Sequence, residues 1–265
     1  MLTNKSGDFI GAHQKFNRVA HRHLRELLEL RNISFPSLKQ ILRFEGKNGP
    51  DGIKAKSPGH DEPYHFYDPF DPTYTELLEY LNDHYSKLVA SLKKQDTEKA
   101  SYEAAWLAHV LTDGLTPAHH FPYEEELEKL RGEDNSTRNS IAAKNIIKGE
   151  NTFQTVKKNW HFWGPKGLFT THWWFEWGVT AIIKPLKMHN AMPTEYDIKT
   201  VKHLGIEEFF KRTAREIALL DMYDRFYKRG WTPSLAKDVR RVMAPLISRT
   251  ITLAWHSAAL EAQQT

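Results

Sequence analysis

The chain has 265 residues, 40% of them hydrophobic, a formal net charge of +4 and a pI near 9.0. It contains no cysteine, which excludes disulfides and thiolate zinc sites and leaves any metal to His, Asp and Glu side chains. The mildly basic balance suits anionic substrates but does not by itself indicate nucleic-acid binding. The length allows one sizeable core. We see no linker and expect residues 1–265 to form a single domain.

The first residues, MLTNKSGDF, lack the charged and apolar runs of a signal peptide. No apolar run approaches the roughly 20 residues that are needed to span a bilayer. We therefore expect no transmembrane segment, and a chain that is either cytoplasmic or the mature form of a secreted protein.

Residues Gly11 to Arg31 predict a helix, because large apolar residues recur at three- and four-residue spacing along one stripe. His13 continues this stripe and is a candidate metal ligand. His21 and His23 lie on the flanks of the same helical wheel, so we interpret them as surface or boundary residues.

The next segment, Phe44 to His60, is rich in Gly, Pro and charge, which predicts an irregular loop that contains Asp51. His65 follows in PYHFYDPFDP, which is too stiff and apolar for an ordinary solvent loop. We expect this segment to pack against a specific part of the fold. Thr73 to Lys94 then predicts an amphipathic helix.

The central stretch, Ala104 to Phe121, combines apolar helix with three candidate ligands. His109 and Asp113 stand four residues apart and so share one helix face. That face is apolar, and a metal ion would relieve the cost of burying an unpartnered charge there. A glycine and a proline end the helix, and His119 follows the turn. Taken alone, the stretch equally fits a hydrogen-bonded core pair with His119 in a surface loop.

The charged residues 124–140 predict exposed helix and loop. Leu168 to Ile183 predicts a buried helix that places His172 and Glu176 four residues apart, a second imidazole and carboxylate pair at helical ligand spacing. Neighbouring tryptophans, Trp173, Trp174 and Trp177, either form plain core or line a pocket.

Two long helices are predicted at the end of the chain, at Ile206 to Arg229 and Ser234 to Ala262. Because we find no convincing strand and no internal repeat, we predict an all-α fold.

Together the candidate residues resemble the zinc-dependent phospholipase C and P1/S1 nuclease superfamily, whose fold is a compact all-helical domain with a trinuclear zinc cluster. The resemblance is carried by the order and spacing of eight residues, which are His13, Asp51, His65, His109, Asp113, His119, His172 and Glu176. His-Phe-Tyr-Asp-Pro at residues 65–69 is also similar to the bacterial phospholipase C segment. Two features depart from the family: residue 1 is Met1 instead of a zinc-binding tryptophan, and the interval between His119 and His172 is longer.

The resemblance implies a metal site of two or three zinc ions. Asp51, His65, His109 and Asp113 would hold one ion. His119, His172 and Glu176 would hold a second. His13 and Asp113 would hold a third, which the free amine and carbonyl of Met1 would complete.

The resemblance also implies hydrolysis of a phosphoric ester by a metal-activated water, with Asp51 orienting or deprotonating that water. We expect phospholipase C-like cleavage of a phospholipid head group, with transient contact to the membrane surface. A P1-like nuclease acting on single-stranded nucleic acid is the alternative, with bases stacked on Trp160, Trp163 and Trp173. A non-catalytic zinc-binding protein, with no open coordination position, is the alternative of another class.

Overall fold

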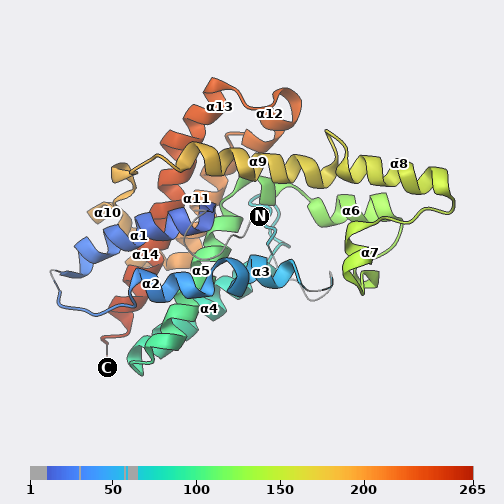
Figure 1. The fold of residues 1–265 in the computed structure, drawn as a ribbon. Coiled ribbons are helices and arrows are strands. Elements are labelled where there is room, and N and C mark those ends of the chain that lie inside the picture. Colours follow the sequence, from blue (N-terminus) through green and yellow to red (C-terminus); the bar gives the residue numbers. More distant parts are fainter. Residues whose placement is uncertain (1–10, 30, 57, 59–64, 265) are drawn as a thin grey trace.

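The computed structural model describes residues 11–29, 31–56, 58 and 65–264, and all regular secondary structure within these ranges is helical (Figure 1). This confirms the predicted all-α fold. The α-helices are α1 (Ala12–Glu29), α2 (Leu38–Ile41), α3 (Pro50–Lys54), α4 (Glu76–Lys93), α5 (Thr97–Gly114), α6 (Tyr123–Arg131), α7 (Ile141–Asn145), α8 (Thr152–Trp163), α9 (Leu168–Ile183), α10 (Glu195–Leu204), α11 (Ile206–Ala218), α12 (Met222–Arg229), α13 (Pro233–Asp238) and α14 (Ala244–Glu261). None of these helices is long and apolar enough to cross a membrane.

The core is built around α5 and α14, which are buried on almost all sides and are packed against α1 and α4. A helix that is apolar all round is stable only where neighbours cover every face. Asp96 caps the start of α5 by accepting a hydrogen bond from the Lys99 amide at 3.0 Å. In the middle of the core, Trp255 of α14 donates its indole N–H to the Ala104 carbonyl of α5 at 3.0 Å. These contacts fix α5, the helix that carries the central candidate ligands.

The predicted helix over Ile206–Arg229 is wrong as a single element. It is divided into α11 and α12 because Asp221 adopts a left-handed backbone conformation, with φ of 47°, and turns the chain. The other long prediction holds, since α13 and α14 are joined without a gap by a π-helical turn, Val239–Met243. This wider turn lies just before Pro245, which has no N–H for a helical hydrogen bond.

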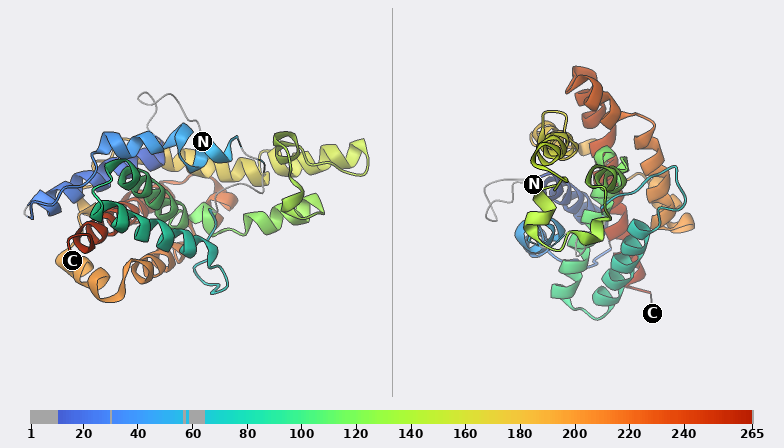
Figure 2. Two further views of the ribbon diagram at one scale, coloured as in Figure 1. Left: turned by 90° about the horizontal axis from the view of Figure 1, so that it is seen from below. Right: turned by 90° about the vertical axis from the view of Figure 1, so that its right-hand side faces the viewer.

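Helices α6, α7 and α8 form an arm that projects from the body of the fold (Figures 1 and 2). The arm has a small core of its own, in which Tyr123, Leu127, Ile147 and Phe162 are packed together with Phe66. Helices α8 and α9 follow each other nearly end to end in these views. The arm accounts for the long interval in the sequence between His119 and His172.

Candidate metal centre

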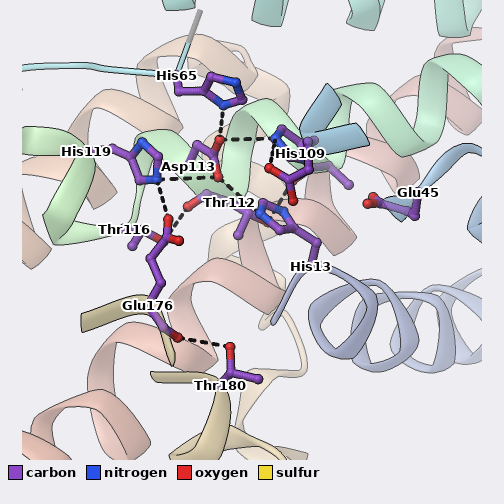
Figure 3. Close-up of polar contacts among 12 residues, drawn as sticks. His13, Glu45, His65, His109, Thr112, Asp113, Thr116, His119, Glu176 and Thr180 are labelled. Atoms are coloured by element: carbon purple, nitrogen blue, oxygen red, sulfur yellow. Dashed lines mark hydrogen bonds and ion pairs between the residues drawn. The ribbon is translucent and has the colours of Figure 1, made fainter. Parts of the chain in front are cut away.

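Asp113 lies at the middle of the candidate centre, where four imidazoles surround its carboxylate (Figure 3). The Nε2 atom of His109, one turn earlier on α5, is 3.1 Å from Oδ2 of Asp113. His65 contacts the same oxygen through Nδ1. The Nε2 atoms of His13 and His119 lie 3.3 and 3.8 Å from Oδ1. All five side chains are buried, so a single carboxylate is shared by imidazoles from four different segments.

Local structure brings these segments together. His13 lies in the first turn of α1 and its ring stacks on that of His109, with the centroids 4.0 Å apart. His119 lies in a short 3-10 helix, Pro117–His120, directly after α5. The segment that carries His65 is held to this 3-10 helix by a hydrogen bond from the Tyr67 amide to the His119 carbonyl at 2.9 Å. The expectation that the aromatic and proline-rich segment packs against a specific part of the fold is therefore confirmed.

A second group of donors lies beside the first and is joined to it by His119. Oε1 of Glu176 is 3.0 Å from Nε2 of His119 and 3.2 Å from Nε2 of His172. His172 and Glu176 share one face of α9, as their four-residue spacing predicts. Their donor atoms and that of His119 all lie within 4.8 Å of one another, as do those of His13, His109 and Asp113.

Asp51 lies at the edge of the first group. Its Oδ1 atom is 3.9 Å from Nε2 of His109. The predicted irregular loop is wrong at this point, because Asp51 belongs to the short helix α3, which starts after Gly49 with Pro50 in its first turn. The side chain is partly exposed, so its carboxylate is open to water.

A family model for zinc dependent phospholipase C matches residues 35–223. The chain belongs to this family. The match contains every predicted ligand except His13, which precedes it. Membership of this family identifies the chain as a zinc-dependent hydrolase of phosphoric esters. Comparisons with curated proteins and with solved structures give no further match.

The donors fit the zinc that the phospholipase C family requires. Both nitrogens of the buried His109 ring are without a hydrogen bond among the described residues, although Nε2 lies 3.1 Å from Asp113. Burying a polar atom without a hydrogen bond lowers the free energy of unfolding. His65 is hydrogen-bonded to Asp113, and His119 and His172 to Glu176, but each of these rings keeps one nitrogen without a partner among the described residues. Converging imidazole nitrogens and carboxylate oxygens are a donor set that zinc binds. A bound cation would satisfy them.

The charges of the ionisable groups at this candidate centre are set by burial and by the neighbouring charges. Burial opposes ionisation of Asp113, but the adjacent imidazoles of His109, His119 and His13 hold the pKa of its carboxyl well below the usual range. Burial and the nearby Lys54 ammonium lower the pKa of His65 to about 3, so this ring is neutral. Burial also lowers the pKa of His13, yet Asp113 and Asp51 outweigh it and raise that pKa to about 10. Metal binding at His13 therefore has to release a proton.

Two further charged groups beside the centre were not identified from the sequence. Glu45 is buried next to His13 and His109 (Figure 3) and accepts a hydrogen bond from the Asn17 amide at 2.8 Å. It lies between two 3-10 turns and has no local pattern that could have revealed it. Lys54 could have been found from the sequence, because it follows Asp51 by three residues and so shares a face of α3 with it.

Lys54 is joined to the arm by a second lysine. Its ammonium lies 5.7 Å from the centroid of the Phe66 ring, which in turn contacts the rings of His119 and His172. Lys144 of α7 donates a hydrogen bond to the Lys54 carbonyl. The Lys144 side chain therefore reaches the backbone of Lys54, whose ammonium lies beside the candidate ligands.

Two interpretations of single residues need correction. His23 is buried, not at the surface or boundary, because its Nε2 atom lies 3.0 Å from the Met188 carbonyl. Trp174 and Trp177 are not plain core, since they lie exposed on the outer face of α9 with their rings in edge-to-face contact. The prediction that Met1 completes a third zinc site concerns residues outside the described part of the chain.

Proposed function

We propose that this protein is a phospholipase C-like enzyme that cleaves a phospholipid head group at its phosphodiester bond. The observation that carries the proposal is the position of Asp113 between two adjacent donor groups. One of its oxygens faces His65 and His109, and the other faces His13 and His119. A carboxylate in this position is suited to bridge two cations.

We assign eight residues as zinc ligands, namely His13, Asp51, His65, His109, Asp113, His119, His172 and Glu176. The two donor groups, His13 with His109 and Asp113 and His119 with His172 and Glu176, support two ions. A third ion, held by His13 and Asp113, is what the family resemblance implies. When bound, the zinc ions neutralise phosphate oxygens and lower the pKa of a water molecule. We further propose that the whole chain, residues 1–265, acts as one hydrolase domain.

The chain's own residues supply the remaining chemistry. Asp51 is open to solvent beside His109, and we assign it the role of orienting the attacking water and accepting its proton. Lys54 places a cationic side chain next to the centre, and Lys144 lies against the Lys54 backbone; both would bind the phosphate oxygens of the substrate. The lysines therefore favour an anionic diester as the substrate.

A single-strand nuclease is the second candidate, and the observation that favours it is the exposure of Trp160 and Trp163 on α8. Aromatic side chains on a surface with basic neighbours can stack bases. Trp173, the third ring considered, is only partly exposed and contacts Trp174. It is therefore less available for stacking than the other two.

One assay separates these functions. The zinc-loaded protein is incubated in parallel with phosphatidylcholine vesicles, a soluble choline phosphodiester and single-stranded DNA. The proposal expects head-group release from the two choline substrates and little cleavage of DNA. Nucleotide products with intact phospholipid would assign the nuclease function instead. Tightly bound zinc with no turnover of any substrate would support the non-catalytic alternative.

A further inference from the structure

Helix α8 directs four large apolar side chains into solvent, which we call the α8 stripe. Phe153, Val156, Trp160 and Trp163 are 77%, 64%, 66% and 43% exposed. Their spacing of three, four and three residues places them on one helix face. The opposite face of α8 carries Phe162, which is buried in the arm core. The helix therefore presents apolar side chains on the face that needs none for folding.

Exposed apolar area extends from the α8 stripe to the neighbouring helix α7. Trp163 donates its indole N–H to the Asn145 carbonyl at 2.8 Å, which holds the end of the stripe against α7. Ile146, the next residue along, is exposed, and so is Ile141 at the start of α7. Contiguous apolar surface of this kind marks a site of interaction.

The charge around the α8 stripe identifies its partner. From Asn151 to Phe175 the sequence has no Asp or Glu, and Lys157 is exposed beside the stripe. The exposed Glu150 directly precedes α8 and accepts a hydrogen bond from the Gln154 side chain, so the nearest acid lies at the start of the helix. Trp and Phe rings prefer the boundary between lipid head groups and acyl chains, and lysines next to them are attracted to anionic head groups. A nucleic acid would use the lysine charge but not the aliphatic side chains of Val156, Ile141 and Ile146.

The position of the arm in the chain also links the α8 stripe to the metal centre. It leaves the body just after His119 and returns just before His172, so both ends of the arm are attached to the metal-binding segments. Helix α8 leads almost in line into α9, which carries His172 and Glu176 (Figure 2). A surface bound by the α8 stripe would hold the centre close to its substrate.

We propose that the α8 stripe docks the protein on an anionic phospholipid bilayer, with its rings at head-group level. The identity of the surface rests on the proposed phospholipase C-like function, but binding itself does not. The stripe is separate from the metal-binding residues, so its removal should leave hydrolysis of a soluble substrate unchanged.

The test compares wild type with the double variant Phe153→Ser and Trp160→Ser. Binding is measured by co-sedimentation with vesicles of phosphatidylcholine and of phosphatidylcholine mixed with phosphatidylserine. Burying one large apolar side chain contributes about 1.5–3 kcal/mol, so losing two, even if partly inserted, should weaken binding by at least about tenfold. Tyr196→Ser, which removes a 75% exposed aromatic side chain from α10, is the matched control and should bind like wild type.

Three further readouts complete the test. Lys157→Gln should weaken binding to the anionic vesicles only, and added salt should have the same effect. Brominated acyl chains should quench tryptophan fluorescence of wild type more than that of the double variant. Zinc content and turnover of the soluble choline phosphodiester should be equal in both proteins, which shows that the variant is folded.

Several outcomes would overturn the α8 proposal. These are wild-type binding by the double variant, absence of wild-type binding to either vesicle, or a wild-type dimer in solution that the double variant abolishes. Protection of the stripe by single-stranded DNA alone would also overturn it. Vesicle binding that depends on the stripe, without any phospholipid hydrolysis, would instead support the docking site and reject the proposed substrate.

Discussion

Replacing Asp113 with Asn tests the centre most directly, because the two side chains have the same shape and differ in charge. Asp113 is 3% exposed, and four imidazole nitrogens face it. Asp113→Asn removes the charge that would bridge two ions. Losing a residue that only hydrogen-bonds to a metal ligand already lowers metal affinity by about 10–100-fold. We therefore expect at least about a 100-fold loss of zinc affinity, with a comparable loss of activity.

The assay measures zinc per chain after dialysis, turnover of a soluble choline phosphodiester, and thermal unfolding with and without a chelator. Wild type should lose thermal stability when the chelator is added, because metal binding favours the folded state. Asp113→Asn should unfold at a lower temperature than wild type without the chelator, and the chelator should change its unfolding temperature little. In the metal-free protein the same change leaves a buried charged imidazole without its partner, which costs about 3–5 kcal/mol.

Glu103→Gln provides a matched control on the same helix. Glu103 is also 3% exposed and accepts a hydrogen bond from Nδ1 of His84 at 2.7 Å, away from the centre. This variant should lose stability but keep its zinc and its chelator response. Wild-type zinc content and chelator response in Asp113→Asn would refute the bridging role.

Four other substitutions give three separate tests. His13→Ala should lower zinc content, whereas His23→Ala should keep it and lose about 1 kcal/mol of stability, measured in denaturant, since a buried carbonyl loses its partner. Burial and the neighbouring Lys54 charge lower the pKa of Lys144 to about 8, so KM should rise above about pH 8 as the charge is lost, and Lys144→Arg should abolish this rise in steady-state assays. Gly178→Ala would place a methyl group 2.0 Å from the Trp231 indole nitrogen, and calorimetry should show about 1–3 kcal/mol of overpacking.

The sequence by itself determined α1, α4, α5 and α9 and the two candidate ligand pairs that lie within α5 and α9. Helix geometry is local, so four-residue spacing is enough to place His109 beside Asp113 and His172 beside Glu176. Apolar periodicity was likewise enough to predict α1 and α4, because a buried stripe repeats every three or four residues. The helix α9 was predicted as a buried helix, whereas only one face of it is buried. The break at Asp221 was missed, since nothing in the apolar pattern records a left-handed residue.

Residue spacing could not bring distant residues together. The grouping of His13 and His65 with Asp113 followed only from the family resemblance, and the tertiary structure shows how it arises. His13 and His65 reach Asp113 because α1 and the segment after α3 pack against α5, and this packing depends on the whole core. Glu45 joined the centre in the same way, without a local signal. The tertiary structure also decided that Trp160 points into solvent. A hydrophobic side chain is more stable away from water, but whether the fold covers it depends on where the neighbouring helices lie.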